Sequence, residues 1–262
     1  MECTIKITKP QIDELAREYE TFDFIKDDPI LFPHRFSADK KDCEIAGFIA
    51  SLMAYGNRKV FIKKLNELFE VAQNEPHNFI QNFEPKLLKD FNYRFGTTED
   101  FVQIFTIMKE LYQKDGGLEE LFKFAYENSN SYFADGKKYI NFEPITDYFY
   151  SRFPQNAGQG CYFMIPNPRN GGAMKRMCML LRWFIRKSEV DLGIWNFMSP
   201  SELLIPLDTH VARLSREVGI LTRKSNDFKA VLEITENLRK FDPTDPIKYD
   251  FALFGYGVTH KG

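Results

Sequence analysis

Apolar residues recur along the chain three or four positions apart, as on one face of an α-helix, most clearly in residues 12–19, 45–53, 61–69, 101–111 and 177–185. Thr8 to Gln11 has the form of a capping box, and Thr97 to Asp100 can cap a second helix. Gly56-Asn57 and Gly116-Gly117 can each end a helix in a left-handed conformation. Because no segment alternates between apolar and polar residues over a useful length, the pattern predicts an all-α fold.

The size and composition of the chain are those of a globular protein. It has 262 residues, of which 44% are hydrophobic, and this is too apolar for a disordered chain. Such a chain can form one large domain, or two helical lobes with a cleft between them. Met1 to Pro10 lacks the apolar core of a signal peptide, and no later apolar run is long enough to span a bilayer. We therefore expect a cytoplasmic protein with no membrane partner.

The cysteines offer no spacing that is typical of a metal site. Cys3, Cys43, Cys161 and Cys178 are scattered along the chain without a C-x-x-C pair. We therefore expect neither a structural zinc ion nor an iron–sulfur cluster.

The net charge of -2 hides an uneven distribution of charged residues. Residues 1–130 contain 17 Lys and Arg against 23 Asp and Glu, whereas residues 131–262 contain 18 against 14. Arg169 to Lys187 carries six basic residues and no acidic one. The second half is thus the better candidate for a surface that binds a polyanion. The alternative is a solvated helix face that is merely basic.

One segment of the second half resembles a known catalytic element. Ile205 to Ile220 is similar to the sequence V-D-T-H-V-x-R-V-x-x-R-L-G-L of the helix-hairpin-helix (HhH-GPD) DNA glycosylase superfamily. The aspartate of that element is catalytic, so the resemblance assigns this role to Asp208. It also implies a two-lobed, all-α HhH-GPD-like fold with a cleft between the lobes. We expect residues 38–187 to form one lobe, and residues 1–37 with 188–262 to form the other.

A second segment, Ile165 to Met177, resembles the hairpin motif L-P-G-V-G-x-K-T-A of the same superfamily, with extra residues after Ile-Pro. Lys175 falls at the position of the lysine that acts as lyase nucleophile. Gly171 and Gly172 would supply backbone amides that approach a phosphate. The resemblance, together with the basic residues nearby, gives these expected DNA contacts: Arg169, Asn170, Gly171, Gly172, Arg176, Asn57, Arg58, His210 and Arg213.

A third segment, Ile45 to Phe69, is similar in pattern to an early pair of helices in these enzymes. In the superfamily, the turn between the two helices carries a glutamine that fills the gap left by a flipped base. Ala54 to Arg58 replaces that turn here and lacks the glutamine. Asn57 or Tyr55 would have to substitute for it.

The spacing of the two candidate catalytic residues bears on the substrate. Lys175 and Asp208 are 33 positions apart (208 − 175), which is similar to the archaeal 8-oxoguanine glycosylases and favours an oxidised purine. Tyr249 to Gly255 resembles the closing helix of the superfamily, and no cysteine cluster follows it, which excludes the iron–sulfur subgroup. Over most of its length the chain also resembles DUF2400, a bacterial family without an assigned substrate.

The resemblance implies a DNA glycosylase and lyase that acts as a monomer on double-stranded DNA with a flipped base. Asp208 would stabilise the sugar cation, and Lys175 would form a Schiff base. Because a flipped base is held between aromatic rings, we expect Trp183, Trp195 or Phe163 to wall its pocket. No cofactor is expected, and a monovalent cation bound at the hairpin is left open.

Other interpretations of these residues remain open. Asp208 can be a helix cap alone, and Lys175 can contact a phosphate rather than attack a sugar. The chain would then be a non-catalytic HhH nucleic-acid-binding protein. A helical scaffold for protein partners is a third possibility, which salt-insensitive binding without DNA affinity would indicate.

Overall fold

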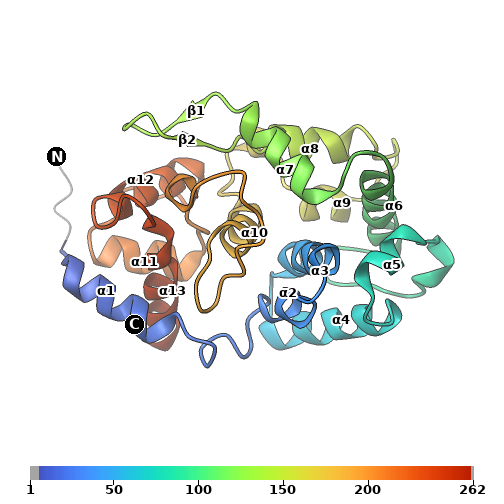
Figure 1. Ribbon diagram of the computed structural model, residues 1–262, viewed down its shortest axis with the longest axis horizontal. Helices are drawn as coiled ribbons and strands as arrows, with labels where there is room; N and C mark the ends of the chain where they lie inside the picture. The colour runs from blue at the N-terminus through green and yellow to red at the C-terminus, as the bar shows by residue number, and fades with distance from the viewer. Residues whose placement is uncertain (1–5, 261–262) are drawn as a thin grey trace. The chain divides into compact units, whose positions relative to one another are not determined.

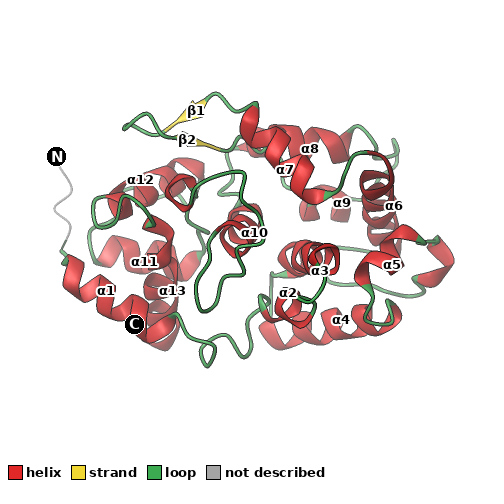
Figure 2. Cartoon of the chain, viewed as in Figure 1, coloured by secondary structure: helices red, strands yellow, loops and turns green. Residues whose placement is uncertain are grey.

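The computed structural model describes residues 6–260, and within these residues helices dominate (Figures 1 and 2). The prediction of an all-α fold is confirmed, with one two-stranded antiparallel sheet as an addition. The helices are α1 (Lys9–Tyr19), α2 (Leu31–Arg35), α3 (Lys40–Met53), α4 (Arg58–Val71), α5 (Pro76–Gln81), α6 (Thr98–Lys114), α7 (Leu118–Glu127), α8 (Glu143–Tyr150), α9 (Gln159–Met164), α10 (Lys175–Ile185), α11 (Thr209–Glu217), α12 (Phe228–Arg239) and α13 (Tyr249–Thr259). Short 3-10 helices lie at Pro85–Leu87, Pro168–Asn170, Pro200–Glu202 and Pro246–Lys248.

The chain folds into two compact units. Unit 1 consists of the described parts of Met1–Lys26, Ser129–Ile140 and Pro168–Gly262, and unit 2 consists of Asp27–Asn128 and Asn141–Asn167. The structure therefore groups α10 with the C-terminal helices, whereas the expected lobe 38–187 contained it. The physical reason is that the charged side chains of α10 are paired with carboxylates that follow it in the sequence.

Helix starts follow the capping signals of the sequence. Thr8 and Gln11 form a capping box at α1, and Thr97 and Asp100 form another at α6. Asp208 caps α11, because its side chain accepts a hydrogen bond from the backbone N–H of Val211. These local hydrogen bonds satisfy amides that have no partner inside the helix.

The core of unit 1 is built around α10 and α13. Helix α1 packs against α13, and α11 packs against α13 as well (Figure 1). Every residue of α10 from Met177 to Ile185 is buried, as its broad apolar face predicts. Trp183 and Trp195 are also buried, and Trp195 makes an edge-to-face contact with Phe184 at 4.8 Å between ring centroids. The expectation that these two tryptophans wall an open pocket is therefore wrong.

The core of unit 2 surrounds α3. This helix is buried from Cys43 to Met53, and it packs against α2, α4, α5 and α7. A phenylalanine cluster fills the space between α5 and α6, where Phe83 meets Phe79 and Phe105 at 5.4 and 5.5 Å. The phenylalanine side chains of α5 and α6 thus belong mainly to the core of unit 2.

Some short elements were not predicted from the sequence, among them α2, α5, α9 and both strands. Strands β1 (Ser131–Tyr132) and β2 (Lys138–Tyr139) pair antiparallel, but two residues are too few to show alternation. Helix α9 begins after Gly158, in a segment without a clear apolar stripe. Asp100, far away in sequence, accepts a hydrogen bond from the backbone N–H of Cys161 at 3.2 Å. This tertiary contact stabilises the start of α9.

Candidate active site

The loop before α10 places Lys175 at the first position of that helix. Gly171 lies in the left-handed region with φ +71°, and Met174 does so with φ +51°. The carbonyl of Gly171 accepts a hydrogen bond from the backbone N–H of Phe228 at 2.9 Å, which attaches the loop to the start of α12. The N–H of Gly171 donates to the carbonyl of Pro168 at 2.9 Å. This amide is therefore already bonded within the loop.

Lys175 and Asp208 come together within unit 1. The ammonium Nζ of Lys175 lies 3.3 Å from Oδ2 of Asp208, and the other oxygen, Oδ1, accepts the N–H of Val211 at 2.8 Å. The side chain of Lys175 is 35% exposed and that of Asp208 is 13% exposed. One carboxylate thus serves as a helix cap and as the partner of the lysine. The cap fixes its orientation, and its second oxygen faces the amine.

A second carboxylate, Asp250, belongs to this site and was not predicted from the sequence. It lies in the first turn of α13, is buried, and forms an ion pair with Arg182. Burial raises the pKa of Asp250 to about 6; Arg182 and Lys175 oppose this shift, and the negative charge of Asp208 adds to it. Asp250 therefore interacts electrostatically with both members of the Lys175–Asp208 pair. The only sequence signal was an acidic residue within the apolar closing segment.

Further along α10 and directly after it, Arg182 and Arg186 form a buried network of ion pairs. Arg182 Nε donates to Asp191 Oδ1 at 3.2 Å, and Arg186 Nη1 donates to Asp191 Oδ2 at 2.7 Å. Arg186 also pairs with Asp245 at 2.8 Å and with Glu20. Both arginines are buried. For Arg182 and Arg186, both interpretations of the basic run, a surface that binds a polyanion and a solvated helix face, are therefore wrong, because their charges are paired inside unit 1.

The remaining DNA-contact candidates of unit 1 differ in how their side chains are engaged. Arg169 and Asn170 are exposed in the loop before α10, and Arg176 is half-buried. His210 Nδ1 lies 3.2 Å from the carbonyl of Gly257. Arg213 Nη2 donates to that same carbonyl at 2.8 Å, and Nη1 pairs with Glu217 at 2.8 Å. His210 and Arg213 thus attach α11 to the C-terminal end of α13.

Gly172, the other expected phosphate-binding glycine, is exposed in the same loop. It forms an isolated antiparallel bridge with Asp227. A side-chain carbon added at Gly172 would meet no atom within 4 Å. Space at this position is therefore open to a ligand or to solvent.

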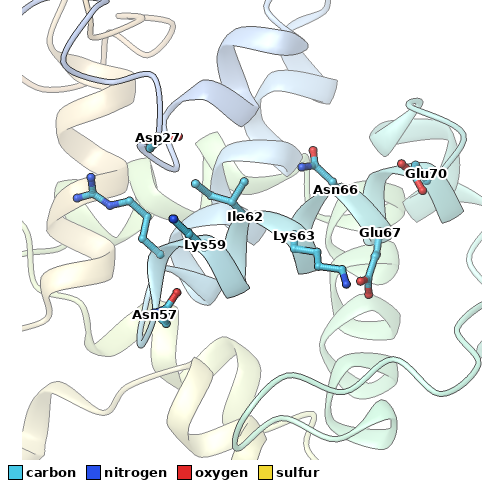
Figure 3. Close-up of a pocket in the computed structure, with 9 residues that line it drawn as sticks. Asp27, Asn57, Lys59, Ile62, Lys63, Asn66, Glu67 and Glu70 are labelled. Carbon is cyan, nitrogen blue, oxygen red and sulfur yellow. The ribbon is translucent and has the colours of Figure 1, made fainter.

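Asn57 and Arg58 lie in unit 2, at the start of α4. The side chain of Asn57 caps α4 by accepting the N–H of Val60 at 3.3 Å. Both residues line a groove of about 750 Å³ that follows α4 (Figure 3). Figure 3 shows Lys59 near the start of α4, Lys63 further along and beside Glu67, and Glu70 at the far end of the groove.

Among residues 6–260, no three His, Cys, Asp or Glu side chains converge in a way that could hold a metal ion. Cys43, Cys161 and Cys178 are buried thiols, and burial raises the pKa of each. Cys3 lies outside the described residues. In the described part of the chain, every helix is too short or too polar to cross a bilayer.

The chain matches the model of a protein family. The family model described as "Protein of unknown function (DUF2400)" matches residues 28–259, a range that includes Lys175, Asp208 and Asp250. No curated protein and no solved structure matches the chain.

Proposed function

Because this chain belongs to the DUF2400 family, whose function is unknown, its activity has to be inferred from its own side chains, and we propose that it is a DNA N-glycosylase and lyase of the HhH-GPD type. The damaged base that it removes is an oxidised purine. The observation that carries this proposal is the 3.3 Å distance between Lys175 Nζ and Asp208 Oδ2. Two groups that the resemblance names as catalytic, 33 positions apart, have the proximity that one reaction centre requires.

Asp208 would act in the first step. When the N-glycosidic bond breaks, the base leaves with the electron pair and positive charge develops on the sugar. A carboxylate held in a fixed orientation stabilises that charge, and such preorganised groups contribute the largest single part of many rate enhancements. The hydrogen bond from the backbone N–H of Val211 to Oδ1 supplies the fixed orientation.

Lys175 would act as nucleophile. Its ammonium group must lose a proton before it can attack, and the departing base needs a proton to leave as a neutral molecule. We therefore assign the ammonium proton of Lys175 to the base. The neutral amine then bonds to C1′ of the sugar, and a proton passes from its nitrogen to O4′ as the C1′–O4′ bond breaks and the Schiff base forms. Loss of a C2′ proton to water then expels the 3′ phosphate with the electron pair of the C3′–O bond, which breaks the strand.

The test is base release and covalent trapping on oligonucleotide duplexes that contain 8-oxoguanine. Lys175→Gln should abolish borohydride trapping, because the Schiff base cannot form. Asp208→Asn should slow base release roughly a hundredfold or more while α11 stays capped, since asparagine is an equally good N-cap. Lys229→Gln, an exposed lysine on α12, is the matched control and should trap normally. Unchanged trapping by Lys175→Gln would overturn the mechanism.

A second candidate is a non-catalytic HhH nucleic-acid-binding protein. Its support is that Asp208 is fully engaged as a cap and as the partner of Lys175, which also explains the pair as a structural contact. The turn from Ala54 to Arg58 moreover lacks the glutamine of the superfamily. DNA binding by the wild-type protein, with neither base release nor trapping over a panel of lesions, would favour this candidate.

A further inference from the structure

A cluster of three aromatic side chains lies at the surface of unit 2. Phe95 is 56% exposed and Phe163 is 38% exposed, and the two rings contact each other at 4.9 Å between centroids. Tyr55 completes the cluster, at 4.7 Å from Phe163 and nearly parallel to Phe95 at 6.4 Å. Large aromatic side chains that gather in one exposed patch commonly mark a binding surface.

The backbone presents Phe95 at the tip of a tight turn. Tyr93 and Gly96 close this turn with two reciprocal backbone hydrogen bonds of 2.9 Å. Arg94, inside the turn, has φ +52°, a conformation that is uncommon for a residue other than glycine. The hydroxyl of Tyr55 donates to the carbonyl of Tyr93 at 3.2 Å, and the hydroxyl of Tyr93 donates to the carbonyl of Tyr55. The cluster is therefore held rigidly, although its outer rings face solvent.

A positive charge accompanies the exposed rings. The guanidinium carbon of Arg94 lies 5.4 Å from the ring centroid of Phe95 and 5.9 Å from that of Tyr55. Its side chain also covers Gly56, where an added side-chain carbon would meet Nη1 of Arg94 at 2.7 Å. Among the residues that the structure describes, no carboxylate forms an ion pair with Arg94. The cluster thus combines stacking surfaces with an available cation.

More cations follow directly in the sequence. Helix α4 begins at Arg58, three positions after Tyr55, and its first turn contains no acidic residue. Lys59 and Lys63 lie one turn apart and line the groove of Figure 3. Within residues 6–260, neither of these lysines is paired with a carboxylate. Three acidic residues also line the groove: Glu67 and Glu70 lie further along α4, and Asp27 lies in the segment before α2 (Figure 3). The basic residues of α4 that line the groove all belong to its first two turns.

We propose that this surface binds unpaired nucleotides: Phe95 and Phe163 stack against nucleobases, and Lys59 and Lys63 contact the neighbouring phosphates. Aromatic rings beside a basic groove are the combination by which proteins hold single strands without sequence preference. An acidic protein partner would use the lysines but would not need two rigid exposed rings beside them. The proposal depends only on residues of unit 2 and is independent of chemistry at Lys175.

The first test measures binding of a fluorescein-labelled single strand of 20 thymidines to the full chain by fluorescence anisotropy. The double variant Phe95→Ala/Phe163→Ala should bind roughly ten- to a hundredfold more weakly, because each stacked base contributes substantially to affinity. Phe124→Ala is the matched control: this phenylalanine of α7 is also 56% exposed, but it lies outside the cluster. Phe95→Trp should retain binding, because it restores a stacking surface. Equal affinities for the double variant and the control would overturn the proposal.

A second test concerns the phosphates. If Lys59 and Lys63 each contact one phosphate, Lys59→Gln/Lys63→Gln should lower the slope of log affinity against log salt by about 1.4, at about 0.7 per contact for a single strand. An unchanged slope would contradict the phosphate contacts. Lys175→Gln should bind the strand normally even if it loses trapping, so failure of this surface can be told apart from failure of the proposed catalysis. Wild-type protein that binds no oligonucleotide at low salt would refute the proposal outright.

Discussion

Two basic helices, α10 in unit 1 and α4 in unit 2, place the same kinds of residue in opposite environments. Arg182 of α10 and Arg186, which directly follows this helix, are buried and paired with carboxylates, among them Asp250 and Glu20 from distant parts of the chain. The segment around the two arginines contains no acidic residue. Lys59 and Lys63 of α4 line an open groove, although acidic residues follow in the same helix. The basic residues in a segment therefore do not identify a polyanion surface. Whether basic residues are available to a polyanion depends on where the carboxylates lie in space.

The largest expected effect comes from breaking the buried network. Arg186→Gln leaves Asp191 buried with only Arg182 as a partner, and it removes the ion pairs of Asp245 and Glu20. Removing one partner of a buried ion pair commonly costs about 3–5 kcal/mol, and we expect a loss of this size in the free energy of unfolding. Lys63→Gln, at an exposed position of α4, should change the free energy of unfolding by less than about 0.5 kcal/mol. Urea denaturation of both variants measures the contrast, and similar losses would break the comparison.

Sequence patterns between neighbouring residues predicted much of the helical fold. They did not predict the contacts between residues that are far apart in the sequence. The capping box at Thr8 and the cap at Asp208 could be predicted because each involves neighbours in the sequence. The contact between Arg182 and Asp250 spans 68 positions, and no periodicity or motif records it. The sequence also gave no sign that Phe95 is exposed, because most of the other phenylalanines belong to the core.

The candidate site shows the same division. Lys175 and Asp208 were expected from the resemblance to a family motif, and the structure brings their charged groups together. Asp250 could not be assigned, because its role depends on burial and on its neighbours in space rather than on its position in a motif. The hairpin loop was expected from the resemblance of Ile165 to Met177 to a family motif. Its attachment to the start of α12 through Gly171 was not, since it is a long-range backbone contact.

A smaller effect should appear in the pH dependence of stability. Burial raises the pKa of Asp250 from an ordinary 3.8 to about 6, so the folded chain holds this proton more tightly than the unfolded chain does. The contribution of Asp250 to stability is therefore greatest at low pH and declines as the pH rises through about 6, by up to about 3 kcal/mol. Asp250→Asn cannot titrate. The free energy of unfolding of the wild type, relative to that of this variant, should therefore fall between pH 4 and pH 8. If the free energies of unfolding of the two proteins change with pH in the same way, the assignment is contradicted.

The smallest expected effect separates the two roles of Asp208 by comparing it with the cap of α4. Asp208 and Asn57 each accept a backbone N–H at a helix start, so Asp208→Ala and Asn57→Ala should each lower the free energy of unfolding by about 1 kcal/mol. Asp208→Asn should restore the stability of α11 without restoring the charge beside Lys175. A stable Asp208→Asn protein that releases no base would assign the carboxylate to catalysis, because capping has been preserved. Full base release by the same variant would show that Asp208 acts only as a helix cap, as Asn57 does at α4.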